Sequence, residues 1–189
     1  MAQNFSKLPK YLRDQFVMLA KREDVAGSVA LAVANYFRRL PPHIRNLLVE
    51  MAKRDTSVAR HVANAVALYF DRLPENVRNL LVVLAEREDT APSVANAVAK
   101  YFRRLPPHIR NLLVEMAKRD TSVAICVANA VARNLAKIPD DFRNLVNDSL
   151  NSLLNKFVDS SGKITSCKTF PLSTVVSGSV KPKTNAGSG

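Results

Sequence analysis

Apolar residues recur along this chain at the spacing of amphipathic helices. Each unit carries one stripe at positions i, i+3, i+4, i+7 and i+8 and then a second, as in Ile44, Leu47, Leu48, Met51 and Ala52 followed by Val58, Val62, Ala65, Val66, Tyr69 and Phe70. Cap-forming Asp55, Thr56 and Ser57 separate the two stripes. The residue before a proline avoids the α region and proline suits the first helical turn, so each Leu-Pro step ends one helix and begins another. The pattern predicts helical hairpins.

The hairpin is repeated in tandem. Prolines that follow Leu or Ile recur every 32 or 33 residues, at Pro9, Pro41, Pro74, Pro106 and Pro139. Residues 36–67 return as residues 101–132 with only Arg60 and His61 changed, to Ile125 and Cys126. One hairpin cannot bury both of its stripes, whereas stacked neighbours can. The sequence therefore predicts an all-α solenoid of about four and a half hairpins, or nine helices, over residues 1–157.

The C-terminal end of the predicted stack differs from its interior. In the last half unit Asn147 and Asp148 take the places of Val82 and Val83, while a single apolar stripe remains, as an end layer requires. Residues 158–189 then hold four of the five glycines, many Ser and Thr, and several lysines. This composition indicates an irregular tail, either disordered or an extended arm that a partner orders.

Three features of each unit, from residue 8 to residue 157, carry a resemblance to a known family. They are a leucine-rich first helix, an acidic turn, and a second helix that begins near a Val and continues with closely spaced Ala; the acidic turns are Asp24, Asp55, Asp89 and Asp120. In these features the chain resembles the HEAT-like repeat family. It departs from the family where Ala59 follows Val58 and the arginine comes one residue later, at Arg60.

The resemblance implies a right-handed α-solenoid that serves as a scaffold, with the second helices lining its concave face. On that geometry the outer positions of the second helices are expected on the concave face, including Asn35, Asn64, Asn96 and Asn129. The fold serves many partners, so it predicts no particular function.

The charge balance points to an anionic partner. The chain has 28 Lys and Arg against 16 Asp and Glu, a net charge of +12. Because a solenoid repeats each surface position at every layer, single cations become rows, and rows of cations attract phosphate backbones through counterion release. The candidate binding residues are Arg38, Arg39, Arg60, Lys100, Arg103, Arg104 and Arg133. The sequence thus predicts a non-catalytic scaffold that binds RNA, DNA or a ribonucleoprotein.

Other interpretations of the same residues stay open. One arginine recurs in every first helix, and it equally suits a structural role near helix ends and acidic turns (Arg13, Arg45, Arg78, Arg110 and Arg143). The mixed outer face of the second helices equally suits a peptide or helix of a protein partner, which makes an interaction adaptor the alternative function. Ile125 makes the last full layer more apolar, at a place where a partner or the tail would dock. A third possibility is an assembly subunit joined through the tail.

The chain shows no signature of catalysis, a cofactor or a metal. His43, His61 and His108 stand in different units without ligand spacing, and Cys126 has no recurring His or carboxylate placed to activate it. HEAT-like DNA glycosylases use aromatic side chains and an acid in a concave cleft, and the absence of Trp does not support that likeness. We therefore expect no enzyme, no cofactor and no metal.

The segments and cysteines of the chain also bear on where it works. Two cysteines, Cys126 and Cys167, do not make a disulfide-stapled scaffold. No apolar run is long enough for a membrane span, and the first residues lack the hydrophobic block of a signal peptide. We expect a cytoplasmic protein with no membrane partner.

Overall fold

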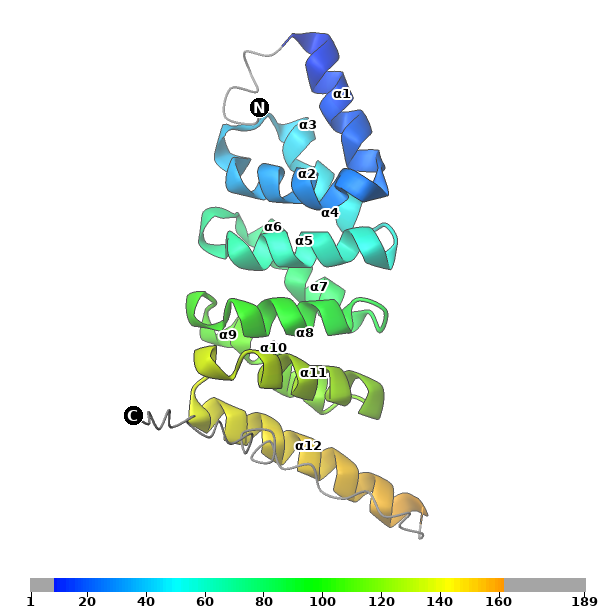
Figure 1. Cartoon of the computed structure of the whole chain (residues 1–189), viewed down its shortest axis with the longest axis vertical. Helices are drawn as coiled ribbons and strands as arrows, with labels where there is room; N and C mark the ends of the chain where they lie inside the picture. Colours follow the sequence, from blue (N-terminus) through cyan, green and yellow to red (C-terminus); the bar gives the residue numbers. More distant parts are fainter. Residues whose placement is uncertain (1–8, 162–189) are drawn as a thin grey trace, which may run out of the picture.

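The computed structural model describes residues 9–161, and within this range every regular element is a helix (Figure 1). Helices α1 (Lys10–Lys21) and α2 (Glu23–Asn35) form the first hairpin. In the next three hairpins the first helix has two pieces: α3 (Pro42–Arg45), α4 (Leu47–Ala52) and α5 (Thr56–Leu68); α6 (Glu75–Arg78), α7 (Leu80–Glu86) and α8 (Ala91–Lys100); α9 (Pro107–Arg110), α10 (Leu112–Ala117) and α11 (Thr121–Arg133). Helix α12 (Asp140–Ser161) follows them. With each two-piece helix taken as one, residues 9–161 contain nine helices, which confirms the predicted all-α fold.

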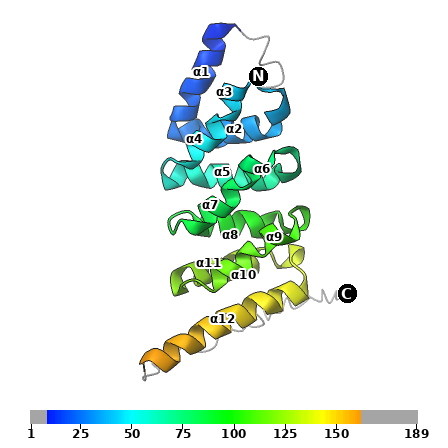
Figure 2. The ribbon, with the colours of Figure 1, turned by 180° about the vertical axis from the view of Figure 1, so that it is seen from behind.

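The hairpins stack in chain order along the long axis of the molecule. Figure 1 shows α2, α5, α8 and α11 as successive rungs, and Figure 2, the view from behind, shows the first helices in front of them. Each second helix contacts the second helix of the next hairpin, and α1 and α12 lie at opposite ends of the stack. This is the order of layers that a solenoid requires. The right-handed sense of the solenoid stays a prediction.

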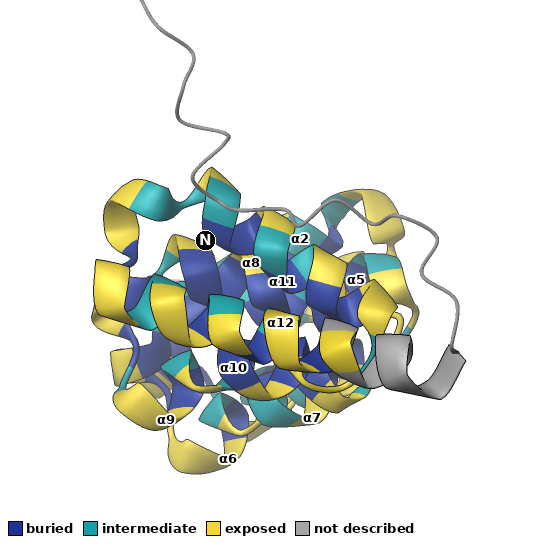
Figure 3. Ribbon diagram, turned by 90° about the horizontal axis from the view of Figure 1, so that it is seen from below, coloured by how far each residue is buried: buried dark blue, intermediate teal, exposed yellow. Residues whose placement is uncertain are grey.

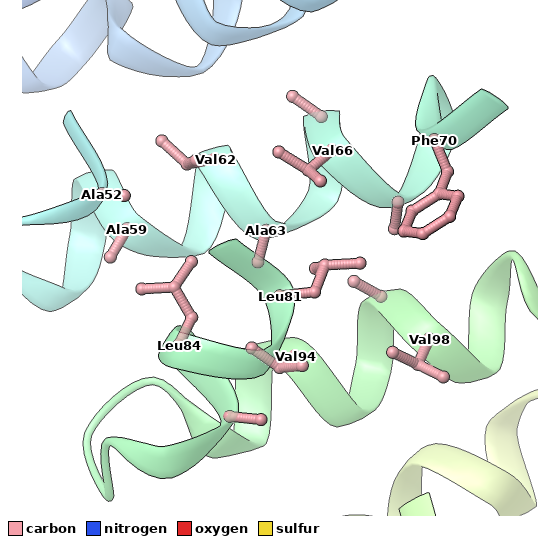
Figure 4. Packing of buried hydrophobic residues seen from close by; sticks show 14 of the residues in the cluster. Ala52, Ala59, Val62, Ala63, Val66, Phe70, Leu81, Leu84, Val94 and Val98 are labelled. Carbon is pink, nitrogen blue, oxygen red and sulfur yellow. The ribbon is translucent and has the colours of Figure 1, made fainter. Parts of the chain in front are cut away.

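Small residues on the second helices allow the close packing of the layers. Ala59, Ala63 and Val66 of α5 are fully buried, and alanine side chains let neighbouring helices approach one another. Leucines of the first helices fill the space between layers, as Figure 4 shows for Leu81 and Leu84 of α7 between α5 and α8. Seen along the stack, the buried residues lie between the second helices on one side and the first helices on the other (Figure 3).

The first helices of the three interior hairpins bend, where the sequence predicts continuous helices. The bends are at Asn46, Asn79 and Asn111, whose ψ angles of −19°, −14° and −18° are flatter than the helical value near −42°. Asparagine alone does not cause the bend, because Asn144 follows the same Arg in α12, which is continuous. The bends occur in the three hairpins that pack against a layer on each side, whereas α1 and α12, at the ends of the stack, are continuous.

The last helix continues to Ser161, beyond the predicted boundary at Phe157. Residues 162–189, which include Cys167 and most of the predicted tail, lie outside the described residues. No helix among the described residues has the length and apolar character needed to cross a membrane.

Candidate nucleic-acid interface

The two ends of every hairpin stack into two long edges on opposite sides of the molecule (Figure 1). At one edge, here the turn edge, each first helix turns into its second helix. At the other, here the proline edge, each second helix passes through a short 3₁₀ turn and a Leu-Pro or Ile-Pro step into the next first helix. The 3₁₀ turns are η2 (Phe37–Arg39), η3 (Phe70–Arg72), η4 (Phe102–Arg104) and η5 (Leu135–Lys137).

Charge is divided unequally between the two edges. The turn edge has seven cations and seven acids and therefore no net charge: Lys21, Arg22, Lys53, Arg54, Arg87, Lys118 and Arg119 against Glu23, Asp24, Asp55, Glu86, Glu88, Asp89 and Asp120. Counted over the same window, from the last residue of one helix to the second residue of the next, the proline edge has eight cations and four acids, a net charge of +4: Arg38, Arg39, Arg72, Lys100, Arg103, Arg104, Arg133 and Lys137 against Asp71, Glu75, Asp140 and Asp141. The proline edge is therefore the more basic of the two edges.

The recurring arginines of the first helices have a structural role. Arg45 donates from Nε to the carbonyl oxygen of Leu40 at 2.5 Å, and its guanidinium carbon lies 5.6 Å from the centre of the Phe37 ring. Arg110 and Arg143 donate to the equivalent carbonyls at 2.6 and 3.0 Å. The residue before each proline is extended, so its carbonyl lies outside the helix ladder, and these bonds satisfy it. Three of the five arginines thus have a structural role, through a backbone carbonyl of the preceding connection and not through an acidic turn; Nε of Arg13 and of Arg78 is buried without a hydrogen-bond partner among the described residues.

A second arginine series binds each hairpin to the one before it. Arg54 donates to the carbonyl oxygens of Ala20 and Lys21 at 2.7 and 2.8 Å. Arg87 and Arg119 make the same kind of contact in the next two layers. These three residues, here the interlayer arginines, satisfy carbonyls at the C-terminal end of the preceding first helix. The sequence shows only their period, because the acceptors belong to another hairpin.

The predicted binding arginines at the proline edge are the least engaged. The side chains of Arg38, Arg39 and Arg104 are exposed and form no hydrogen bond or ion pair with any described residue. Arg103 donates from Nη2 to the carbonyl oxygen of Ala136 at 3.0 Å and remains exposed. The proline edge thus brings together four of the predicted residues, three of them without a structural partner in residues 9–161.

The other predicted cations lie on the second helices. Lys100 and Arg133 are exposed and end α8 and α11, so they adjoin the proline edge. The Lys100 ammonium lies 5.2 Å from the centre of the Tyr101 ring. Arg60 is exposed in the first half of α5, two turns from the proline edge, and the structure does not bring it together with the rest.

The four predicted asparagines follow the second helices. Asn64, Asn96 and Asn129 occupy one equivalent position and lie on the outer side of the stack, the first half-buried and the others exposed. Asn35 is half-buried, and its Oδ1 accepts a hydrogen bond from Nη1 of Arg72 at 2.9 Å. The placement of these residues on a concave face stays a prediction.

Two clefts open between layers at the proline edge. The first, of about 370 Å³, lies between η2 and η3 and is lined by Arg38, Arg39, Asp71 and Arg72 among others. The second, of about 530 Å³, lies between η3–α6 and η4–α9; its charged and polar lining is Asp71, Glu75, Arg78, Asn79, Arg104, His108 and Arg110. The sequence did not single out Asp71 and Arg72. The candidate residues were the Arg-Arg pairs of two other turns, and η3 has Asp-Arg in place of such a pair.

The described residues offer no candidate metal centre at this interface. No group of three His, Cys, Asp or Glu side chains in the described part of the chain is placed to hold a metal ion. Cys126 is half-buried and unpaired with another cysteine. No protein-family model, curated protein or solved structure matches this chain. Membership of the HEAT-like family therefore stays a prediction.

Proposed function

We propose that this chain is a non-catalytic scaffold that binds nucleic acid through its phosphate backbone, along the proline edge. The unequal division of charge carries the proposal: the same repeated hairpin has no net charge at one edge and +4 at the other. At the turn edge the interlayer arginines donate to carbonyls of the preceding layer, whereas Arg38, Arg39 and Arg104 have no such contact with a described residue.

The stack turns these side chains into a row. Neighbouring layers of packed helices are about 10 Å apart, so the exposed cations of η2, η3, η4 and η5 recur at that interval along the proline edge, with Arg39 and Arg104 two layers apart. Guanidinium groups bind phosphate oxygens in a planar fork, and each phosphate that they neutralise releases a condensed counterion. Affinity therefore accumulates over the layers without any one strong site.

The same surface is poor in groups that read bases. Tyr36, Tyr69 and Tyr101 occur at the proline edge, but all three are half-buried and pack against the core. Single-stranded sequence recognition relies on bases stacked on exposed aromatic rings. We therefore expect binding with little preference for base sequence.

A matched pair of double variants tests the proposal. Arg39 and Arg104 are equivalent, exposed residues of the proline edge, and Lys53 and Lys118 are equivalent, exposed residues of the turn edge. The variants R39A/R104A and K53A/K118A remove the same charge from opposite edges. Fluorescence anisotropy with a labelled single-stranded oligonucleotide, measured against salt concentration, gives the slope of log affinity for each protein.

The two variants are expected to differ. A single-stranded phosphate contact contributes about 0.7 to the salt slope, so R39A/R104A lowers the slope by about 1.4 while K53A/K118A leaves it near the wild-type value. Equal losses in both variants would show that only net charge matters and would contradict binding at the proline edge. No binding at low salt would contradict the function itself and favour the protein adaptor, for which Ile125 of α11, 56% exposed, is the apolar contact.

A further inference from the structure

The second cleft of the proline edge contains two carboxylates beside its arginines. Asp71 of η3 and Glu75 of α6 line it together with Arg78 and Arg104. Both acids are exposed, and no ion pair joins either to a described residue. A surface that served phosphate alone would gain nothing from these carboxylates, because like charges in the same cleft repel the ligand.

The wall of this cleft also has an unused donor. In the equivalent arginines, Arg45 and Arg110, Nε donates to a leucine carbonyl at 2.5 and 2.6 Å. In Arg78 the buried Nε has no hydrogen-bond partner among the described residues; its Nη2 donates to the backbone oxygen of Asp71 at 3.1 Å. At this cleft the proline edge therefore differs from the equivalent places in the second and fourth hairpins, both in its carboxylates and in the missing hydrogen bond of the Arg78 Nε.

The ligand must offer hydrogen-bond donors beside its phosphates. Ionised carboxylates only accept hydrogen bonds. A DNA backbone carries no donor, whereas an RNA backbone carries a 2′-hydroxyl on every sugar. Nucleobases also carry donors, but the Phe70 ring that lines this cleft is buried in the core and offers no exposed face for stacking; the exposed ring of the lining is His108, 6.4 Å from Phe70.

We propose that this cleft holds a ribonucleotide of a bound RNA, and that the chain thereby prefers RNA to DNA. Arg104 and His108 face the phosphate, and the 2′-hydroxyl donates to the carboxylates of Asp71 and Glu75. The inference rests on the proposed function, since the cleft is one segment of the proline edge. It adds a preference that the arginine row alone does not supply.

The test compares three single-stranded oligonucleotides of one uracil-containing sequence: RNA, DNA and 2′-O-methyl RNA. The variant D71A/E75A removes both carboxylates of the cleft. The matched control E23A/E88A removes two exposed acids of the turn edge, which stand at equivalent positions and form no ion pair with a described residue. Both variants raise the net charge equally, so a general electrostatic effect appears in both.

We expect the wild type and E23A/E88A to bind RNA about tenfold more tightly than DNA, the effect of one hydrogen bond to a charged acceptor at an exposed site. The 2′-O-methyl RNA binds like DNA, because methylation removes the donor. In D71A/E75A the preference disappears while binding of both nucleic acids persists.

The other possible results distinguish failure of the ribonucleotide site, of the carboxylates as its origin, and of the proposed function. Equal wild-type affinity for RNA and DNA refutes the ribonucleotide site and leaves the phosphate-binding edge intact. A preference that survives in D71A/E75A, or that extends to 2′-O-methyl RNA, refutes the carboxylates as its origin. No binding of any oligonucleotide refutes the proposed function as well.

Discussion

The interlayer arginine Arg87 joins the second and third hairpins, and its removal measures how strongly one such contact stabilises the stack. Its Nη1 donates to the carbonyl oxygen of Ala52 at 2.9 Å, and its Nη2 to that of Arg54 at 3.3 Å. The same guanidinium forms a two-bond ion pair with Asp89, at 3.1 and 2.8 Å. Methionine at this position keeps the apolar stem of the side chain and removes all of these bonds.

Arg22 provides the matched control. It occupies the equivalent place in the first hairpin and forms the same two-bond ion pair, with Asp24, at 3.1 and 2.7 Å. It has no hydrogen bond to the carbonyl of another layer among the described residues. The difference between R87M and R22M therefore isolates the two bonds between layers.

The expected magnitude follows from exposure and charge. The side chain of Arg22 is 63% exposed, so solvent screens its ion pair with Asp24 and little stability is lost with it. Arg87 is only 32% exposed, and hydrogen bonds from a charged donor contribute about 1.5 kcal/mol each at the lower end of their range. R87M is therefore expected to destabilise the protein by about 2–3 kcal/mol more than R22M.

Urea unfolding followed by circular dichroism measures the effect. A loss of about 2–3 kcal/mol corresponds to a thermal midpoint lowered by roughly 5–10 °C for a chain of this size. Because each layer contacts only its neighbours, weakening the central interface is also expected to broaden the R87M transition. Equal destabilisation by R87M and R22M would refute the reasoning, since the carbonyl contacts would then contribute nothing beyond the ion pair.

Three further substitutions test the packing and the electrostatics. A Cβ added at Gly27 lies 2.8 Å from Nδ1 of His61, so G27A is expected to lower the thermal midpoint and G27A/H61A to recover it. In the near-identical copy Cys126 takes the place of His61, and in the hairpin before it Pro92 takes the place of Gly27. A histidine at position 126 would be too large beside a proline, so C126H should lower the free energy of unfolding in urea by about 1–3 kcal/mol and C126S by much less. The Val58 N–H lowers the pKa of Asp55, so the stability that this carboxylate contributes is present above its unfolded pKa and lost as pH falls through its folded pKa. Urea titrations between about pH 6 and pH 2.5 should show a shallower acid limb for D55N than for wild type.

The structure also explains one of the two changes between the near-identical copies, from His61 to Cys126; nothing in it explains the change from Arg60 to Ile125. His61 packs against Gly27, the glycine of the first hairpin, where no side chain stands in its way. In the later copy the preceding hairpin offers Pro92 at that place, and the smaller Cys126 replaces the histidine. The sequence alone shows that the residues differ, and the contact between hairpins supplies the reason.

Part of the candidate site was predictable from the sequence. Arg38, Arg39, Arg103 and Arg104 were named from their repeat positions, and the structure places them together. Two first helices end in a Lys-Arg pair, and the structure divides each pair: Arg54 and Arg119 bind carbonyls of the preceding layer, whereas Lys53 and Lys118 pair with Glu50 and Glu115 on their own helices.

The sequence by itself determined the hairpin, its repetition and the number of helices. Apolar spacing, caps and Leu-Pro steps act between residues a few positions apart, so they can be read along the chain. Only the tertiary structure decided which arginines are engaged and which edge carries the net charge. The acceptors of the interlayer arginines lie 33 to 35 residues away, in a neighbouring hairpin, and an exposed guanidinium and a bonded one have the same sequence signature until the layers are stacked.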